Sequence, residues 1–147
     1  MVTTQDDRLL EAASRLRLAI VRTARRMRQE AGTDLSPTLT AALGTIDRHG
    51  PLTPSELAEA ERVKRPTATR IAASLEADEL IVRAPDPSDG RGSLLSISPR
   101  GRDLLKRLRR RKNAYLSRRL RELESDDVEA LERAAEVLER MLEGEKR

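Results

Sequence analysis

The chain has 147 residues, which is enough for one domain with its own core and too few for two independent domains. It carries 29 Lys and Arg against 25 Asp and Glu, and the net charge of +4 favours an anionic partner. With no Cys and one His it lacks a disulfide, a thiolate metal site and a cysteine nucleophile, and we expect no metal and no cofactor.

The first predicted element is a long amphipathic helix between Leu9 and Met27. Its apolar residues recur at spacings of three and four, which places them on one face, and Gly32 ends it. A second helix begins at Ser36 and Pro37, a cap residue followed by a proline that suits the first turn. It closes at residues 49–51, where His, Gly and Pro follow one another.

Two short helices are predicted next. Thr53 and Glu56 form a capping box at the start of the first, which continues to Ala60. The second runs from Pro66 to Asp78 after a polar turn, and Arg65 is its expected N-cap residue. Two short helices joined by a tight turn indicate a helix-turn-helix unit. The inward side of the second helix consists of Ala68, Ile71, Ala72 and Leu75.

A β-hairpin is predicted after these helices. The apolar runs Leu80–Val82 and Leu94–Ile97 flank a turn-rich basic loop, Arg83–Arg91, which places an arginine at the hairpin tip. Such a hairpin is a wing, and Leu52 is a candidate for a minimal third strand. A donor-rich helix beside a basic hairpin suits duplex DNA, because the helix fits the major groove while the hairpin reaches the backbone or the minor groove.

Two further helices complete the chain. Ser98 and Pro99 start the first, and Ser125 with two Asp residues is the expected cap of the second. Apolar stripes on the first and the last two helices exceed what a small winged unit can bury, which favours a homodimer over a monomeric bundle. The residues expected at the dimer interface are Leu9, Ala13, Leu16, Ile20, Leu116, Leu120, Leu123, Leu131, Leu138 and Leu142.

Asp89, Gly90 and Arg91, followed by Leu95, Ile97, Ser98 and Gly101, resemble the wing signature of MarR-family transcriptional regulators. The helix from Pro66 to Glu76 is similar to the recognition helix of that family, and the resemblance covers nearly the whole chain. Ser98 stands where the family commonly has threonine, and it keeps the hydroxyl cap. The resemblance implies a winged helix-turn-helix homodimer that binds an imperfect palindrome, usually represses, and is often released by a small ligand.

The expected fold is mainly helical with a small β-wing. It forms one MarR-like domain, residues 1–147, which has two regions. Residues 36–98 form the expected winged helix-turn-helix, and residues 1–32 and 99–147 form the expected dimerisation region. The family-like effector pocket would lie between these regions, with a mainly aliphatic lining. Whether an effector exists is left open.

Site roles follow from side-chain chemistry. Arg91 is the expected wing contact to phosphate or minor groove, and Asp89 is expected to orient it by charge pairing. Arg70 can reach guanine in the major groove, and a poorly capped helix start leaves N–H groups for a phosphate. Solvated faces and local caps are the alternatives. The expected DNA-binding residues are Ser36, Thr38, Ser55, Lys64, Arg65, Pro66, Thr67, Thr69, Arg70, Arg91 and Ser93.

The sequence therefore predicts a regulator that binds double-stranded DNA as a homodimer. A winged-helix module that binds another protein is the alternative, whereas an enzyme is disfavoured because phosphate loops, paired carboxylates and nucleophile motifs are not recognisable. Most of the basic run Lys106–Lys112 is expected to be solvated or paired with the acidic last helix, and direct contact with DNA is the alternative. No apolar run approaches the ~20 residues of a membrane span, and the polar start lacks a secretion signal, which predicts a cytoplasmic protein.

Overall fold

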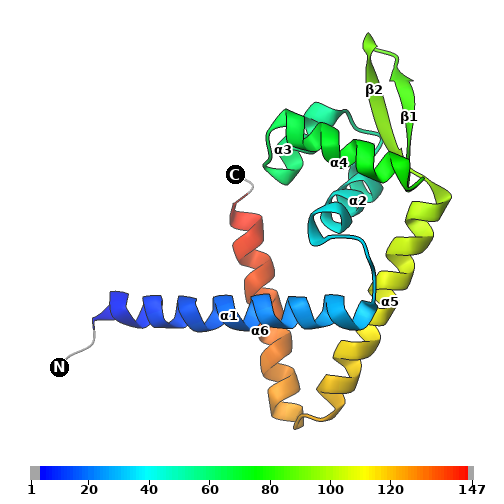
Figure 1. Cartoon of the computed structure of the whole chain (residues 1–147). Helices are drawn as coiled ribbons and strands as arrows, with labels where there is room; N and C mark the ends of the chain where they lie inside the picture. Colours follow the sequence, from blue (N-terminus) through cyan, green and yellow to red (C-terminus); the bar gives the residue numbers. More distant parts are fainter. Residues whose placement is uncertain (1–3, 146–147) are drawn as a thin grey trace.

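The computed structural model describes residues 4–145, so the first three and last two residues of the expected single domain lie outside the described part. Within residues 4–145 the chain forms six helices and a two-stranded antiparallel sheet (Figure 1). This confirms the expected mainly helical winged fold and its element order. The elements are α1 (Gln5–Ala31), α2 (Pro37–His49), α3 (Pro54–Glu61), α4 (Arg65–Ala77), β1 (Ile81–Asp86), β2 (Asp89–Ile97), α5 (Pro99–Arg121) and α6 (Ser125–Gly144).

Local signals define most helix boundaries. Ser36 Oγ accepts from the N–H of Leu39 at 3.2 Å, and the Thr53 and Glu56 capping box forms as expected. Gly32 ends α1 in the left-handed conformation, with φ of 63°. Two predicted caps are wrong by one residue. Lys64 rather than Arg65 precedes α4, and Glu124 rather than Ser125 precedes α6, and neither side chain makes a capping hydrogen bond.

The hairpin is more regular than the sequence suggested. Most of the expected loop, Arg83–Arg91, is strand, and only Pro87 and Ser88 connect β1 to β2. Pairing continues through Pro85 opposite Ser93, because an edge strand can accept a proline whose missing N–H is not needed by a neighbour. Leu52 adds one isolated bridge to Leu95, which confirms the minimal third strand.

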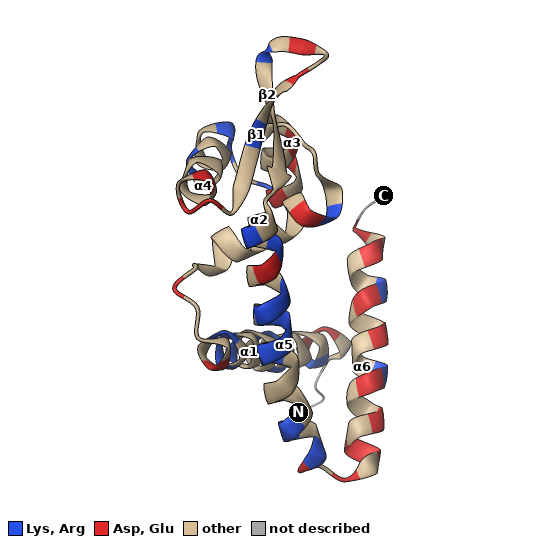
Figure 2. Ribbon diagram, turned by 90° about the vertical axis from the view of Figure 1, so that its right-hand side faces the viewer, with Lys and Arg blue, Asp and Glu red and all other residues tan. Residues whose placement is uncertain are grey.

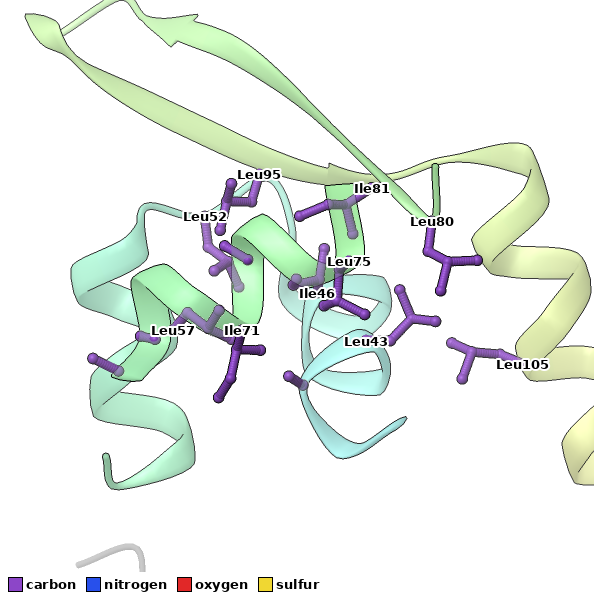
Figure 3. Packing of buried hydrophobic residues seen from close by; sticks show 14 residues of the cluster. Leu43, Ile46, Leu52, Leu57, Ile71, Leu75, Leu80, Ile81, Leu95 and Leu105 are labelled. Atoms are coloured by element: carbon purple, nitrogen blue, oxygen red, sulfur yellow. The ribbon is translucent and has the colours of Figure 1, made fainter. Parts of the chain in front are cut away.

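The main core lies between α2, α3, α4, the base of the wing and the start of α5. Leu43, Leu57, Leu75 and Leu95 are fully buried there, together with shorter apolar side chains from each of these elements (Figure 3). Burial of this kind stabilises a fold by about 1.5–3 kcal/mol for each large apolar side chain. The winged unit, with the start of α5, therefore has a core of its own.

The joint between wing and α5 is tightly packed. Ser98 Oγ donates to the carbonyl of Glu79 at 2.6 Å and accepts from the N–H of Gly101 at 3.0 Å. A Cβ on Gly101 would lie 2.1 Å from the carbonyl oxygen of Leu80, so only glycine allows this approach. The serine in the wing signature is thus a cap and a link between the end of α4 and α5.

The terminal helices are packed differently. α6 buries none of its residues, and Figure 2 shows it as a separate rod whose ribbon is coloured red for Asp and Glu along much of its length. Of the residues expected at the dimer interface, Leu116, Leu120 and Leu138 are half-buried, and the others are exposed. The exposed members are Leu9, Ala13, Leu16, Ile20, Leu123, Leu131 and Leu142.

Candidate nucleic-acid interface

The start of α4 presents an uncapped helix terminus to solvent. Lys64 is the N-cap residue and its side chain makes no capping hydrogen bond, so the first N–H groups have no side-chain partner from that residue. Pro66 lies in the first turn, where its missing N–H costs nothing. The positive end of the helix dipole is therefore available to an anion, as expected, although the cap residue was misassigned.

One face of α4 is buried and the other carries the expected polar residues. Ala68, Ile71, Ala72 and Leu75 are buried against the core, as their spacing predicted. Thr67 is half-buried, and its hydroxyl accepts from Arg70 Nη2 at 3.4 Å rather than capping the helix. The exposed site residues of this segment are Lys64, Arg65, Pro66, Thr69 and Arg70.

The wing extends beyond α4 as a narrow hairpin (Figure 1). Arg91 is exposed in β2, close to the turn but not within it. Asp89 Oδ1 accepts from the backbone N–H of Arg91 at 3.0 Å, and among the described residues it makes no ion pair with that guanidinium. The expected charge pairing is thus wrong, because Asp89 shapes the backbone and leaves the arginine side chain extended into solvent.

A second carboxylate also orders the wing turn. Asp86 Oδ1 accepts from the N–H and the hydroxyl of Ser88, at 3.0 and 2.7 Å. These hydrogen bonds, the one from the hydroxyl first, lower the pKa of Asp86 below its usual value. The turn therefore keeps a negative charge near Arg91.

The helix-start hydroxyls are divided by their local roles. Ser36 caps α2, so its hydroxyl already has a structural partner, whereas Thr53 rather than Ser55 caps α3. Ser36, Thr38 and Ser55 are all exposed. Ser93 is half-buried and accepts from Arg83 Nη1 at 3.2 Å. Sequence reasoning missed Arg83 as a site residue, because it placed Arg83 in the loop rather than on a strand.

Comparison with known proteins places this geometry in a family. Residues 35–93 match the model of the MarR family. An uncharacterized HTH-type transcriptional regulator of Mycobacterium leprae is 39% identical over 127 residues, which cover 86% of this chain and 89% of that protein. The chain belongs to the MarR family of HTH transcriptional regulators. The expectation of a DNA-binding regulator rather than an enzyme is confirmed at the level of this family.

Solved structures support the same fold for this MarR-family chain. A putative transcriptional regulator from Pseudomonas aeruginosa is 33% identical, with a TM-score of 0.82, covering 95% of this chain and 97% of the other. A mutant of Staphylococcus aureus MepR bound to an oligodeoxyribonucleotide has a TM-score of 0.68 at 20% identity, covering 90% and 96% of the two chains. At that identity, the second match shows the fold alone.

Three arginines of α5 in this MarR-family chain contact α1 and α2. Asp47 of α2 pairs with Arg102 at 3.9 Å and with Arg109 at 3.4 Å. Arg111 Nη1 donates to the carbonyl of Ala31 at 2.9 Å. Lys106, Arg107 and Arg110 are exposed, as the solvated alternative expected. Within residues 4–145 the partners of Arg109 and Arg111 lie in α2 and α1 rather than in α6. Part of the positive charge is therefore structural.

A cavity of about 370 Å³ lies where the winged unit meets the terminal helices. Apolar side chains of Leu35, Leu80 and Leu104 line part of it. The expectation of a mainly aliphatic lining is wrong, because arginines and aspartates also reach the cavity. These charged residues are Asp34, Asp78, Arg100, Arg107 and Arg111.

Two negative findings concern only the described part of the chain. None of its helices is long and apolar enough to cross a membrane. It also holds no group of three or more His, Asp or Glu side chains suited to a metal ion.

Proposed function

We propose that two copies of this MarR-family chain bind a pseudo-palindromic site on double-stranded DNA and repress transcription there. The observation that carries the proposal is the exposed polar face at the start of α4, in a chain that also exposes an arginine in β2 of the wing. A helix with threonine and arginine side chains can read base edges in the major groove, while a hairpin arginine binds phosphate or a narrow minor groove.

The roles of the site residues divide by reach. Thr69 and Arg70 would read bases, because they project from the first turns of α4, and Arg70 can form two hydrogen bonds to guanine. Arg91 would bind the backbone or the minor groove. Phosphates would be held by the remaining hydroxyls, cations and free N–H groups of Ser36, Thr38, Ser55, Lys64, Arg65, Thr67 and Ser93. Pro66 has no N–H to donate and would contribute only an apolar contact beside them.

The second copy would cover the terminal helices. α6 buries none of its residues within one chain, and Leu131 and Leu142 are 50% and 63% exposed. Exposed leucines in a stripe along a helix favour association with a matching helix. Two-fold symmetry would then place two α4 helices at half-sites one DNA turn apart, ~34 Å. In this division residues 1–32 and 99–147 dimerise, and residues 36–98 bind DNA.

A small effector belongs to the same proposal. The cavity between the two regions carries three arginines and two aspartates beside leucine side chains, which suits a polar ligand with an apolar body. A ligand there would contact α5 and the end of α4 together, so it could change the angle of the winged unit. We also propose a cytoplasmic location, because a regulator of transcription must reach the chromosome.

Salt-dependent binding to duplex DNA tests the proposal. The logarithm of the affinity should fall steeply with the logarithm of the salt concentration, because bound phosphates release counterions. Arg91→Ala should reduce that slope by about one and weaken binding to every duplex. Arg119→Ala removes the same charge from the far end of α5 and is the matched control. A flat dependence would instead favour the protein-binding module.

Base reading has a separate signature. Arg70→Ala or Thr69→Ala should cost about 1–3 kcal/mol on a selected duplex and relax preference at particular base pairs. On a scrambled duplex the affinities of the two variants should differ little from the affinity of the unmodified chain. Equal losses of affinity on both duplexes would show that α4 does not read bases and only binds phosphates.

A further inference from the structure

Arg83 lies where the hydrophobic core gives way to the exposed part of the wing. In β1 it shares a face with Ile81, and across the hairpin it pairs with Leu95. Ile81 and Leu95 are 2% and 0% exposed, so this face of the hairpin points toward the core. Arg83 is the next residue outward on that face, and its side chain is 31% exposed.

The guanidinium of Arg83 joins three elements. Its Nε lies 2.7 Å from Oε2 of Glu76 in α4. Its Nη1 donates to Oγ of Ser93 in β2 at 3.2 Å. Ser93 is diagonal to Arg83 across the ladder, a spacing that a long side chain spans. A single side chain of β1 thus holds the recognition helix and the opposite strand of the wing.

Glu76 is placed against a local preference of its helix. It lies in the last turn of α4, which contains no basic residue, and carboxylates are unfavourable near the negative end of a helix dipole. Arg83 supplies the missing positive charge from outside the helix. The pair leaves the local charge near zero, so its effect on DNA is geometric rather than electrostatic.

We propose that Arg83 is a positioning residue for DNA recognition, fixing the angle between α4 and the wing so that Arg91 and Arg70 can engage one site together. The proposal rests on the proposed function. Without the bridge, the hairpin would keep its core contacts at Ile81 and Leu95, but its outer half would no longer be tied to α4. Recognition of a correct site would suffer, whereas general attraction to DNA would not.

Charge-neutral variants test this role. Glu76→Ala combined with Arg83→Ala removes the bridge at constant net charge. The probes are a duplex enriched by the unmodified chain from a random pool and a scrambled duplex of equal length. We expect about fivefold weaker binding to the enriched duplex, the upper range for one exposed ion pair, with the scrambled duplex and the salt slope unchanged.

Two further variants make the comparison specific. Exchanging the pair, Glu76→Arg with Arg83→Glu, should restore most of the selectivity, because an ion pair can form again. Arg119→Ala with Glu122→Ala removes an ion pair of 3.0 Å from the far end of α5. It should leave selectivity unchanged, provided that sedimentation shows the same oligomeric state as the unmodified chain. Thermal unfolding of all variants measures stability separately from the ratio of the two affinities.

Three results would overturn the proposal. Unchanged selectivity in the double alanine variant would show that the bridge does not position the wing. Equal weakening on both duplexes, with a salt slope lower by about one, would make Arg83 a phosphate contact instead. An exchanged pair no better than the double alanine variant would also contradict it. Failure of the unmodified chain to bind any duplex is a different result, which would overturn the proposed function itself.

Discussion

The helices of the winged unit and α6 all carry apolar side chains but use them in opposite ways. In the winged unit, leucines such as Leu43 and Leu57 are fully buried within one chain. In α6, Leu131 and Leu142 are 50% and 63% exposed, and no residue of the helix is buried. An amphipathic pattern therefore indicates that a helix has an apolar face, but it does not indicate whether the same chain or a second molecule covers that face.

The difference separates two kinds of stability. The winged unit gains its free energy of folding within one chain, whereas α6 and the outer half of α1 would gain theirs from association. Substitutions in the first region should act at every protein concentration. Substitutions in the second should act mainly through the monomer–dimer equilibrium, and their effects should depend on concentration.

The largest effect is expected in the core. Leu43→Ala should lower the free energy of unfolding by about 2–5 kcal/mol, because it leaves a cavity beside fully buried neighbours. Urea denaturation followed by circular dichroism measures the change. Leu18→Ala, at a position 50% exposed in α1, is the comparison. Similar losses for both leucines at low concentration would contradict the distinction between the two regions.

The next effect concerns association. Leu131→Asp should weaken the dimer by about 10- to 100-fold, since it removes one leucine from the expected interface and places a charge there. Sedimentation equilibrium across a concentration series measures the dissociation constant. Glu132→Gln changes a neighbouring exposed residue and should leave the dimer intact. If the unmodified chain is monomeric at every concentration, the claim that association covers α6 is contradicted.

A smaller loss is expected at the joint between wing and α5. Gly101→Ala should destabilise the chain by about 1–3 kcal/mol, because the added Cβ would lie 2.1 Å from the carbonyl oxygen of Leu80. Gly144→Ala is the control, since a Cβ there meets nothing within 4 Å. Thermal unfolding of the two variants measures the difference, and equal stability would show that α5 can shift away from the wing.

The smallest expected effect is a gain. Glu79 follows α4 with φ of 60°, a left-handed conformation that glycine adopts without strain. Glu79→Gly should raise the free energy of unfolding by about 0.5–1 kcal/mol, less the weak contribution of its exposed 3.8 Å ion pair with Arg100. Thermal unfolding at fixed concentration tests the sign. A loss of stability would mean that the Glu79 side chain matters more than its backbone strain.

Local patterns predicted the order of elements and the buried face of α4, because capping chemistry and helical spacing act over a few residues. The Ser-Pro pairs at residues 36–37 and 98–99 marked two helix starts correctly. Asp126 and Asp127 are in the first turn of α6 as expected, but Glu124 rather than Ser125 has the extended conformation of the cap. One-residue errors of this kind arise because several neighbours can serve as the cap.

Pairings between distant segments were not predictable from sequence. Asp47 with Arg109, and Glu76 with Arg83, each join separate elements, and an excess of arginine offers many equivalent partners. Asp89 was expected to pair with the guanidinium of Arg91, but it accepts a hydrogen bond from the backbone N–H of that residue instead. The sequence thus identified the candidate DNA-binding surface, and the structure added the contacts that orient it.

Selection of bound fragments from a random duplex pool tests the central claim most directly. Two copies that each insert α4 into a major groove should enrich inverted half-sites whose centres lie one DNA turn apart, ~34 Å. The unmodified chain should therefore yield a two-fold symmetric sequence, with the strongest preferences at the positions that Arg70→Ala relaxes. No enrichment at low salt, or enrichment of a single unpaired half-site, would contradict a dimer that reads DNA through α4 and the wing.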